Sequence, residues 1–189
     1  MITAFASPST YVQGDQLLQH AARYIAPFGN RGLLIADDIV WELVGGQFYH
    51  HLTADGLKIE HIHFNGESSP EEIARIQAIG EARDAKFVIA LGGGKTNDTT
   101  KAVGDQLHVP VVIVPTLASN DSPCTRLSVI YSPNGEFLKY QFYNKNPDLV
   151  LVDSTVIAGA PVRFLVDGIA DAISTNVEAQ TVARARATT

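Results

Sequence analysis

The chain has 189 residues, of which 46% are hydrophobic and 18% charged, and its formal net charge is −6 at pH 7. This composition is typical of an ordered globular protein and excludes an intrinsically disordered chain. Because the chain is acidic and has no basic run longer than a pair, it lacks the electrostatic footprint of a protein that binds nucleic acid or an anionic membrane surface.

Cysteine usage and the N-terminal sequence bear on the compartment. Cys124 is the single cysteine, which excludes an intrachain disulfide and favours a reducing compartment, and we interpret it as a packing residue rather than a nucleophile. Residues 1–14 lack the charged start and apolar core of a signal peptide, and no apolar run is long enough to span a bilayer. We therefore expect a cytoplasmic protein.

Strand and helix patterns alternate in the first part of the chain. Apolar runs predict strands at residues 11–14, 32–36, 57–64, 88–91 and 109–114. Apolar spacing and capping residues predict helices from Asp15 to about residue 25, from 39 to 52, from 69 to 82 and from 97 to 107. The clearest helix start is Ser69-Pro70-Glu71-Glu72, with a cap, a proline at the first position and acids in the first turn.

The second part of the chain has a different pattern. Asn134-Gly135, between apolar runs at 127–131 and 137–142, predicts a β-hairpin, and residues 149–153 predict another strand. From Pro161 onward the pattern is helical, and it stops without a cap, which suggests the front part of a longer protein. The alternation between residues 31 and 115 predicts an α/β fold with a Rossmann-like, mostly parallel sheet and helices on both faces.

A glycine turn follows the apolar run at 88–91. Gly92, Gly93 and Gly94 precede Lys95, and the residues after them can form a helix. Glycines leave no side chain between the backbone and a ligand, and the free amides of a helix N-terminus attract phosphate. The stretch matches neither GxGxxG nor GxxxxGK[ST], so a plain tight turn is the alternative. We interpret it as a pyrophosphate site.

Two further segments follow predicted strand ends. Asp37 ends the strand at 32–36, and Thr116 to Asp121 follow the strand at 109–114. Because ligands bind outside the carboxyl ends of parallel strands, these segments and the glycine turn together predict a nucleotide cleft.

Several acidic side chains at these positions have more than one interpretation. Asp37 could accept hydrogen bonds from an adenosine ribose, which would favour NAD over NADP, or it could cap the next helix in competition with Asp38. Lys95 could pair with a phosphate, and Asp98 could cap its helix or balance Lys95. Asp121 could hydrogen-bond a polyol.

A metal site is less clearly indicated. Asp171 lies inside an apolar helical segment, where an acid is costly unless it is paired or binds a metal, although it could also lie on a polar face with Asp167 and Ser174. His61 and His63 alternate on one strand and are more typical of ordinary strand residues than of ligands.

The motif GGGKTxDTxK at residues 92–101 and the segment PVVIVPTxASxDxPC at 110–124 strongly resemble the iron-containing, or group III, alcohol dehydrogenase family. The resemblance is to its glycerol-oxidising members in particular, which use zinc, and it continues through residues 127–131, 146–153 and 160–164.

The resemblance implies an NAD-binding α/β domain at 1–160 and a helical metal and substrate domain whose first helix is 161–189. It assigns Asp121 to the substrate, as the catalytic residue, and Asp171 to zinc. Two positions depart from the family: Thr125 stands where serine is frequent, and Ala170 replaces the glycine usual before Asp171. The residues assigned to NAD are Asp37, Gly93, Gly94, Lys95, Asp98, Thr116, Ser119, Thr125, Leu127 and Tyr131.

The implied reaction is the NAD-dependent oxidation of glycerol, or a related small polyol, to dihydroxyacetone through a zinc-activated hydroxyl. The family supplies two more zinc ligands, both histidines, from beyond residue 189, so we expect little or no turnover from this chain alone. A truncated, inactive NAD-binding module is the alternative, and a relative of dehydroquinate synthase fits the Asp121 loop less well. The unpartnered apolar face of the helix after Pro161 predicts a homo-oligomer.

Overall fold

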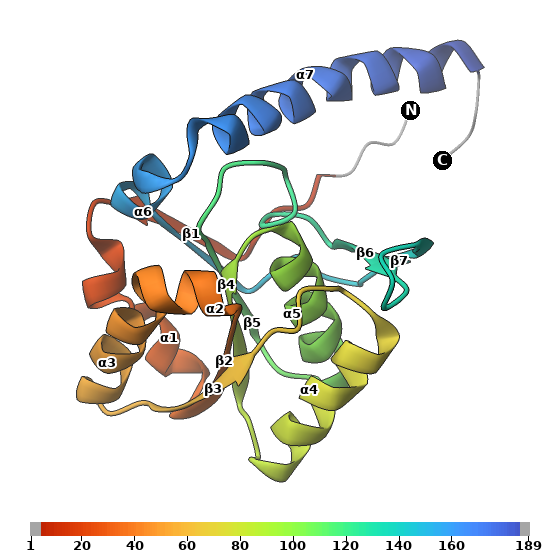
Figure 1. Cartoon of the computed structure of the whole chain (residues 1–189). Coiled ribbons are helices and arrows are strands. Elements are labelled where there is room, and N and C mark those ends of the chain that lie inside the picture. Colours follow the sequence, from red (N-terminus) through yellow and green to blue (C-terminus); the bar gives the residue numbers. More distant parts are fainter. Residues whose placement is uncertain (1–4, 186–189) are drawn as a thin grey trace.

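A computed structural model describes residues 5–185, and its centre is a single sheet of six parallel strands (Figure 1). The spatial order is β1-β8-β5-β4-β2-β3. The strands are β1 (Thr10–Gly14), β2 (Arg31–Ala36), β3 (Lys58–His63), β4 (Phe87–Gly92), β5 (Val111–Pro115) and β8 (Leu149–Asp153).

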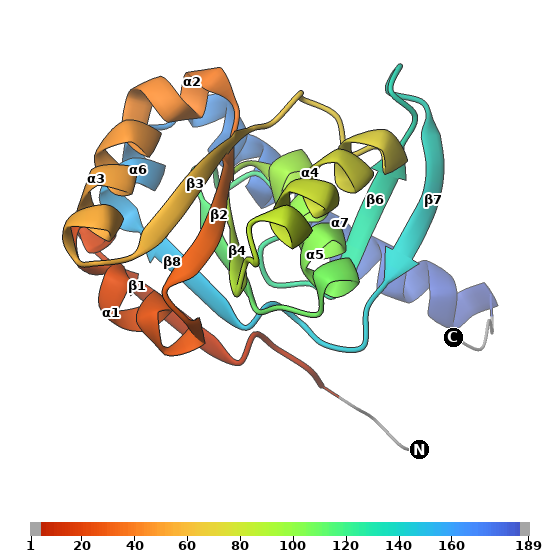
Figure 2. The same cartoon turned by 90° about the horizontal axis from the view of Figure 1, so that it is seen from below.

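Helices cover both faces of this sheet, which confirms the predicted α/β architecture (Figure 2). One face is covered by short elements: η1 (Leu17–His20), α1 (Ala22–Ile25), η2 (Ala26–Phe28), α2 (Asp38–Val40), η3 (Trp41–Gly45), α3 (Gly46–Ala54) and α6 (Ser154–Gly159). The other face is covered by α4 (Pro70–Ala82) and α5 (Gly94–Leu107).

The core has two halves, one on each face of the sheet. Neighbouring residues of a strand enter opposite halves: Leu34 and Ile89 pack toward α3, whereas Leu33 and Val88 pack toward α4 and α5. A strand buried on both faces needs consecutive apolar residues, and this is why the inner strands β2, β4, β5 and β8 are apolar runs, whereas the edge strands β1 and β3 are not.

The strand order reverses between β2 and β4. The chain leaves β2 for β3 at one edge of the sheet and then returns to add β4 on the other side of β2. At such a switch point the loops after the two strands diverge and leave a crevice. Asp37 follows β2 and Gly93 follows β4, so both residues lie beside this crevice.

Two predicted helices differ from those observed. Residues 17–25 form only short turns, because Gln16 has a left-handed φ of 52°, which prevents a continuous helix from Asp15. Asp15 instead accepts a hydrogen bond from Ser154. The predicted helix at 39–52 contains a π-helical turn, η3, in which a Cβ at Gly45 would lie 2.7 Å from the Trp41 ring.

Helix α6 was not predicted from the sequence. Asp153 ends β8 and caps this short helix by accepting hydrogen bonds from the backbone N–H groups of Thr155 (2.9 Å) and Val156 (3.3 Å). In contrast, the Ser69 cap of α4 was predicted, and its hydroxyl accepts from the Glu72 N–H at 3.2 Å.

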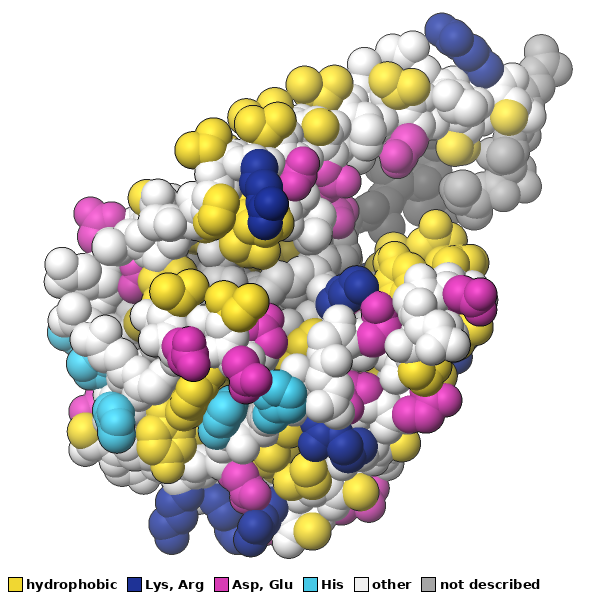
Figure 3. All heavy atoms as spheres, viewed as in Figure 1, with side chains coloured by type: hydrophobic (Ala, Val, Ile, Leu, Met, Phe, Trp, Pro, Cys, Tyr) yellow, Lys and Arg dark blue, Asp and Glu magenta, His cyan; other side chains and the backbone are white. Residues whose placement is uncertain are grey.

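The remaining elements lie outside the main sheet. Strands β6 (Leu127–Tyr131) and β7 (Phe137–Phe142) form the predicted antiparallel hairpin as a separate sheet beside α5. Helix α7 (Val162–Ala185) confirms the helical pattern after Pro161 and has no buried residue. Figure 3 shows hydrophobic side chains along its outer surface. Among residues 5–185, no helix combines the length and hydrophobicity that crossing a bilayer requires.

The close packing of α5 on the sheet gives a stability prediction. A Cβ at Gly104 would lie 2.3 Å from Val111 Cγ2, so Gly104→Ala should destabilise the fold by about 1–3 kcal/mol despite the better helix propensity of alanine. A Cβ at Gly159, in α6, would have no neighbouring atom within 4 Å, so Gly159→Ala should be neutral or stabilising by up to about 1 kcal/mol. Urea unfolding of the two variants tests this, and equal effects would contradict it.

Candidate functional site at the carboxyl ends of the strands

A cavity of about 930 Å³ lies at the carboxyl ends of β2, β4 and β5. Its lining includes five of the residues predicted to bind a nucleotide, from three separate strand ends: Asp37, Gly93, Gly94, Lys95 and Thr116. The opposite wall is apolar and comes mainly from α2, η3 and α3. This combination of an apolar wall and a few convergent polar groups is typical of a ligand site.

The glycine turn has the geometry of an anion site. Gly93 is the N-cap of α5 and makes no side-chain capping bond, so the first amides of this 14-residue helix are left for another acceptor. A Cβ at Gly94 would lie 2.8 Å from Asn120 Nδ2, and one at Gly93 would lie 3.2 Å from Leu117 Cδ1. The hydroxyl of Thr116 is buried without a hydrogen-bond partner. These features fit the binding of a phosphate-containing ligand.

Of the two interpretations of Asp37 that the sequence left open, the structure shows the helix cap, and the ribose contact stays a prediction. The Asp37 Oδ1 accepts a hydrogen bond of 2.8 Å from the Val40 N–H and thereby caps α2. Asp37 also lines the large cavity, so capping and ligand binding do not exclude each other. The neighbouring Asp38 contacts His63 Nδ1 at 2.9 Å instead.

The side chain of Lys95, which follows the glycine turn, contacts residues from two other segments. Its ammonium forms a 2.7 Å ion pair with Glu67, which lies in the loop after β3, and it stands 5.5 Å from the centre of the Tyr131 ring. The structure therefore brings Lys95 and Tyr131 together. A phosphate bound by Lys95 would compete with Glu67, a residue not predicted from the sequence although it also follows a strand end.

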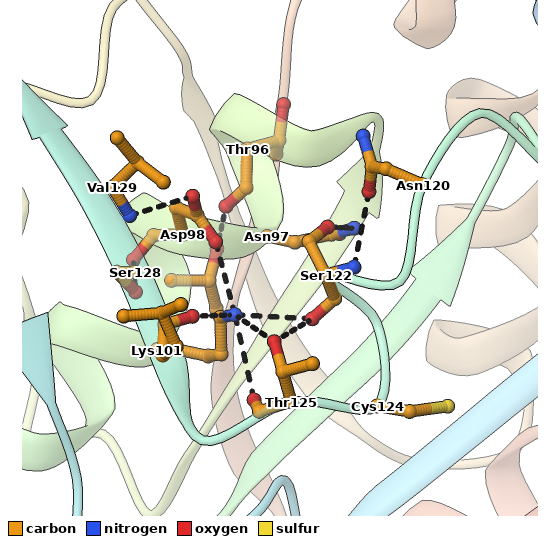
Figure 4. A network of polar contacts seen from close by, with 12 residues as sticks. Thr96, Asn97, Asp98, Lys101, Asn120, Ser122, Cys124, Thr125, Ser128 and Val129 are labelled. Carbon is orange, nitrogen blue, oxygen red and sulfur yellow. Dashed lines mark hydrogen bonds and ion pairs between the residues drawn. The ribbon is translucent and has the colours of Figure 1, made fainter. Parts of the chain in front are cut away.

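Asp98 is buried on the side of α5 that faces the hairpin. Its Oδ1 forms a 2.9 Å ion pair with Lys101, and its Oδ2 accepts a 2.9 Å hydrogen bond from the Val129 N–H (Figure 4). Burial raises the pKa of Asp98 and lowers the pKa of Lys101, and the attraction between the two charges opposes both shifts. These contacts are structural, and a role in cofactor binding stays a prediction.

The loop between β5 and β6 borders a second cavity of about 570 Å³, whose lining includes Asp121 and Cys124. Leu117 and Phe164 contribute to both cavities and form a common wall. Burial raises the pKa of Asp121, and the nearby Asp171 carboxylate raises it further. Burial also raises the pKa of Cys124, which agrees with a packing role.

Five predicted cofactor residues line neither cavity: Asp98, Ser119, Thr125, Leu127 and Tyr131. Thr125 and Leu127 instead contact the ammonium of Lys101. Lys101 was not among the predicted site residues, although its three-residue spacing from Asp98 is a recognisable signal for a pair on one helix face.

Helix α7 approaches this loop at one point. A Cβ at Gly168 would lie 2.0 Å from the Ala118 carbonyl oxygen, so only glycine allows the contact. Asp171, less than one turn further along α7, is exposed. Among residues 5–185, no group of three or more histidine, cysteine or acidic side chains is placed to hold a metal ion. His61 stacks on Trp41, with ring centroids 3.5 Å apart, as expected for an ordinary strand residue.

Comparison with known proteins gives consistent relatives. The chain is 45% identical to glycolaldehyde reductase from Halobacterium salinarum over 97% of its length and 50% of that protein's length. It is also 45% identical to glycerol dehydrogenase from Thermotoga maritima, over 95% of the chain and 49% of that protein. The chain thus spans about half the length of the curated relatives it matches.

Solved structures give the same result. The crystal structure of glycerol dehydrogenase from Schizosaccharomyces pombe superimposes with a TM-score of 0.88 and 38% identity, over 96% of this chain and 46% of that one. The model of the family described as iron-containing alcohol dehydrogenase matches residues 8–154. From this match and the shared α/β architecture, the chain belongs to the iron-containing alcohol dehydrogenase family.

Proposed function

We propose that this chain supplies the NAD-binding part of an enzyme that oxidises glycerol or a related small polyol to the corresponding hydroxyketone. The observation that carries the proposal is the juxtaposition of two cavities, one with Asp37 and the glycine turn and the other with Asp121, across a shared wall. Hydride transfer requires contact between the nicotinamide and the substrate carbon, and neighbouring cavities place the two sites close enough for the bound molecules to meet at their shared border.

The larger cavity suits a dinucleotide. In our proposal the first amides of α5 bind the pyrophosphate, with Lys95 turning from Glu67 toward it, and Asp37 accepts hydrogen bonds from the adenosine ribose. A carboxylate at this position repels a 2′-phosphate, so NAD is favoured over NADP. The bound nicotinamide supplies the hydride acceptor.

Asp121 is the proposed substrate residue. Its carboxylate borders the second cavity, where it can accept hydrogen bonds from polyol hydroxyls. Because the pKa of Asp121 is raised, more of this group is protonated at low pH, and a neutral carboxyl is a weaker acceptor than a carboxylate, so polyol binding through Asp121 should weaken as the pH falls.

The side chains in the described part of the chain, residues 5–185, do not by themselves form a zinc site. Asp171 is one carboxylate donor, and a catalytic zinc normally has three protein ligands. We therefore derive no step through a metal. Zinc, with Asp171 as one ligand and the others outside these 189 residues, stays part of the proposal for a longer protein.

The domain division and assembly are proposed on related grounds. We assign residues 1–160 to the NAD-binding domain and 161–189 to the first helix of a helical domain, because α7 has no buried residue among those described. The exposed apolar residues of α7 also support a homo-oligomer, and a cytoplasmic location fits the single cysteine.

Two other functions have specific support. Identity to glycolaldehyde reductase equals that to glycerol dehydrogenase, so reduction of a small hydroxyaldehyde is a second candidate. An inactive NAD-binding module is the third, since the chain covers only half of its relatives.

NADH binding tests the cofactor site directly. Asp37→Asn keeps an acceptor for the Val40 N–H and so preserves the α2 cap, but it removes the charge offered to the ribose. We expect the Kd for NADH to rise about tenfold, the effect of losing a charge-assisted hydrogen bond. Asp38→Asn is the matched control, because Asp38 contacts His63 and does not line the cavity. An unchanged Kd in Asp37→Asn would remove Asp37 from the site.

A turnover assay distinguishes an active enzyme from an inactive NAD-binding module. We expect the 189-residue chain to bind NADH and to show no glycerol oxidation with NAD and zinc, since one carboxylate is a weak zinc site. Glycerol-dependent NADH production by the purified chain, followed by absorbance, would contradict this expectation.

Asp121 is tested in a version extended to the length of its relatives. There, Asp121→Ala should raise the KM for glycerol by about tenfold or more, because the polyol loses a charged acceptor. A wild-type KM in that variant would refute the substrate role.

A further inference from the structure

The ammonium of Lys101 lies at the centre of a buried network between α5 and the loop that follows β5 (Figure 4). Only 3% of the residue is exposed. Apart from its ion pair with Asp98, Nζ donates to the carbonyl oxygens of Ser122 (3.0 Å), Thr125 (3.5 Å) and Leu127 and to the Thr125 hydroxyl (3.4 Å). All these additional partners come from one loop and its junction with β6.

Lys101 has hydrogen-bond partners in addition to the Asp98 carboxylate with which it forms an ion pair. Burying an ammonium costs several kcal/mol, and one carboxylate offsets the charge but not all three N–H donors. The remaining donors are satisfied by backbone carbonyls of residues 122–127, which have no regular secondary structure before β6. The loop has no strand or helix hydrogen bonds of its own, and Lys101 contacts three of its carbonyls, while the Asn146 Nδ2 amide holds a fourth, that of Cys124, at 2.6 Å.

Asp121 is connected to the Lys101 ammonium through neighbouring residues of the same loop. Ser122, the next residue, presents its carbonyl to Lys101 and accepts a 3.0 Å hydrogen bond from Asn97 Nδ2 on its hydroxyl. Asp121 itself accepts a 3.0 Å hydrogen bond from the Cys124 N–H through its own carbonyl. Its carboxylate position therefore follows from the anchored backbone on its C-terminal side.

We propose that Lys101 is a positioning residue, whose ammonium gathers the carbonyls of Ser122, Thr125 and Leu127 and thereby holds Asp121 at the second cavity. The relevance to substrate rests on the proposed function, because Asp121 is the proposed polyol ligand. The holding of the loop itself does not depend on that function.

The glycine turn is held by other contacts. Asn97 N–H donates to the Gly93 carbonyl and Thr116 N–H donates to the Gly92 carbonyl, each at 3.0 Å. Neither bond involves Lys101. Loss of the ammonium should therefore loosen the Asp121 loop while the phosphate end of the larger cavity stays formed.

Lys101→Met tests the proposal, because methionine keeps most of the aliphatic stem and removes the charge. Cys124 is the single cysteine, lies on the loop and is half-buried, so its alkylation by neutral iodoacetamide reports opening of the loop. We expect labelling to accelerate about tenfold or more, since several hydrogen bonds to a charged group are lost. Lys101 lowers the pKa of the thiol, so removing its charge would by itself slow labelling, and an acceleration therefore measures opening.

Two further variants distinguish opening of the loop from a loss of global stability. Lys145→Met is the control, because Lys145 is an exposed lysine paired only with Asp148, and it should label at the wild-type rate. Asp98→Asn combined with Lys101→Met removes both buried charges, which proteins often tolerate without loss of stability. This double variant should melt near the wild-type temperature and still label rapidly. A folded double variant with the wild-type labelling rate would overturn the proposal.

Ligand binding and hydrogen exchange complete the test. ADP, which carries only the phosphate and adenosine part of the cofactor, should bind the Lys101→Met variant within about twofold of the wild-type Kd, a split that general destabilisation would not produce. In the wild-type chain, the amides of Ser122 and Cys124, which have hydrogen-bond partners within the loop, should exchange much more slowly than unbonded amides, and exchange at the rate of an open loop would overturn the proposal without any variant. If ADP and NADH bind to neither protein, the proposed cofactor function fails, while the labelling result still decides the role of Lys101.

Discussion

Helix α5 is the element on which the rest of the site depends, because it lies between the centre of the sheet and the β6–β7 hairpin and contacts both. Gly104 lets its backbone come close to Val111 on β5, and Ser128 on β6 donates to the Asp98 carbonyl at 2.9 Å. The same helix begins at the glycine turn. A shift of α5 would therefore move the proposed phosphate site, the hairpin and the loop that contains Asp121 together.

The two cavities differ in the kind of structure that forms their borders. The larger cavity is bordered by strand ends, whose positions follow from the register of the parallel sheet. The smaller one is bordered by an irregular loop, which is held by local hydrogen bonds, by Lys101 and Asn97 of α5 and by the Asn146 amide, which donates to the Cys124 carbonyl. In a dehydrogenase, the cofactor is large and makes many contacts, whereas a three-carbon polyol makes few. A small substrate therefore depends more strongly on accurate placement of each side chain that binds it.

Helix α7 has a different relation to the fold. Its one close backbone approach is at Gly168, beside the Ala118 carbonyl, and its apolar residues Leu165, Ile169 and Ile173 are more than half exposed. Exposed apolar surface of this extent is typical of an interface. The relatives are about twice as long as this chain, so both a further domain and a second copy are consistent with such a face.

Local signals in the sequence determined most of the elements and the position of the glycine turn. The apolar run of β4, the Ser69 cap and the Asn134-Gly135 turn act over a few residues, and each was predicted correctly. The carboxyl ends of parallel strands meet at one edge for geometric reasons, so the convergence of Asp37 with the glycine turn could also be predicted.

Contacts between distant segments decided the rest. The left-handed backbone at Gln16 broke a predicted helix, and Asp37 caps α2 while it also lines the large cavity. The environment of Lys101 depends on carbonyl groups 21 to 26 residues further along the chain. Backbone carbonyls leave no trace in residue type or spacing, because every residue has one. Which of them surround a buried ammonium is therefore settled only when the tertiary structure brings the loop against α5.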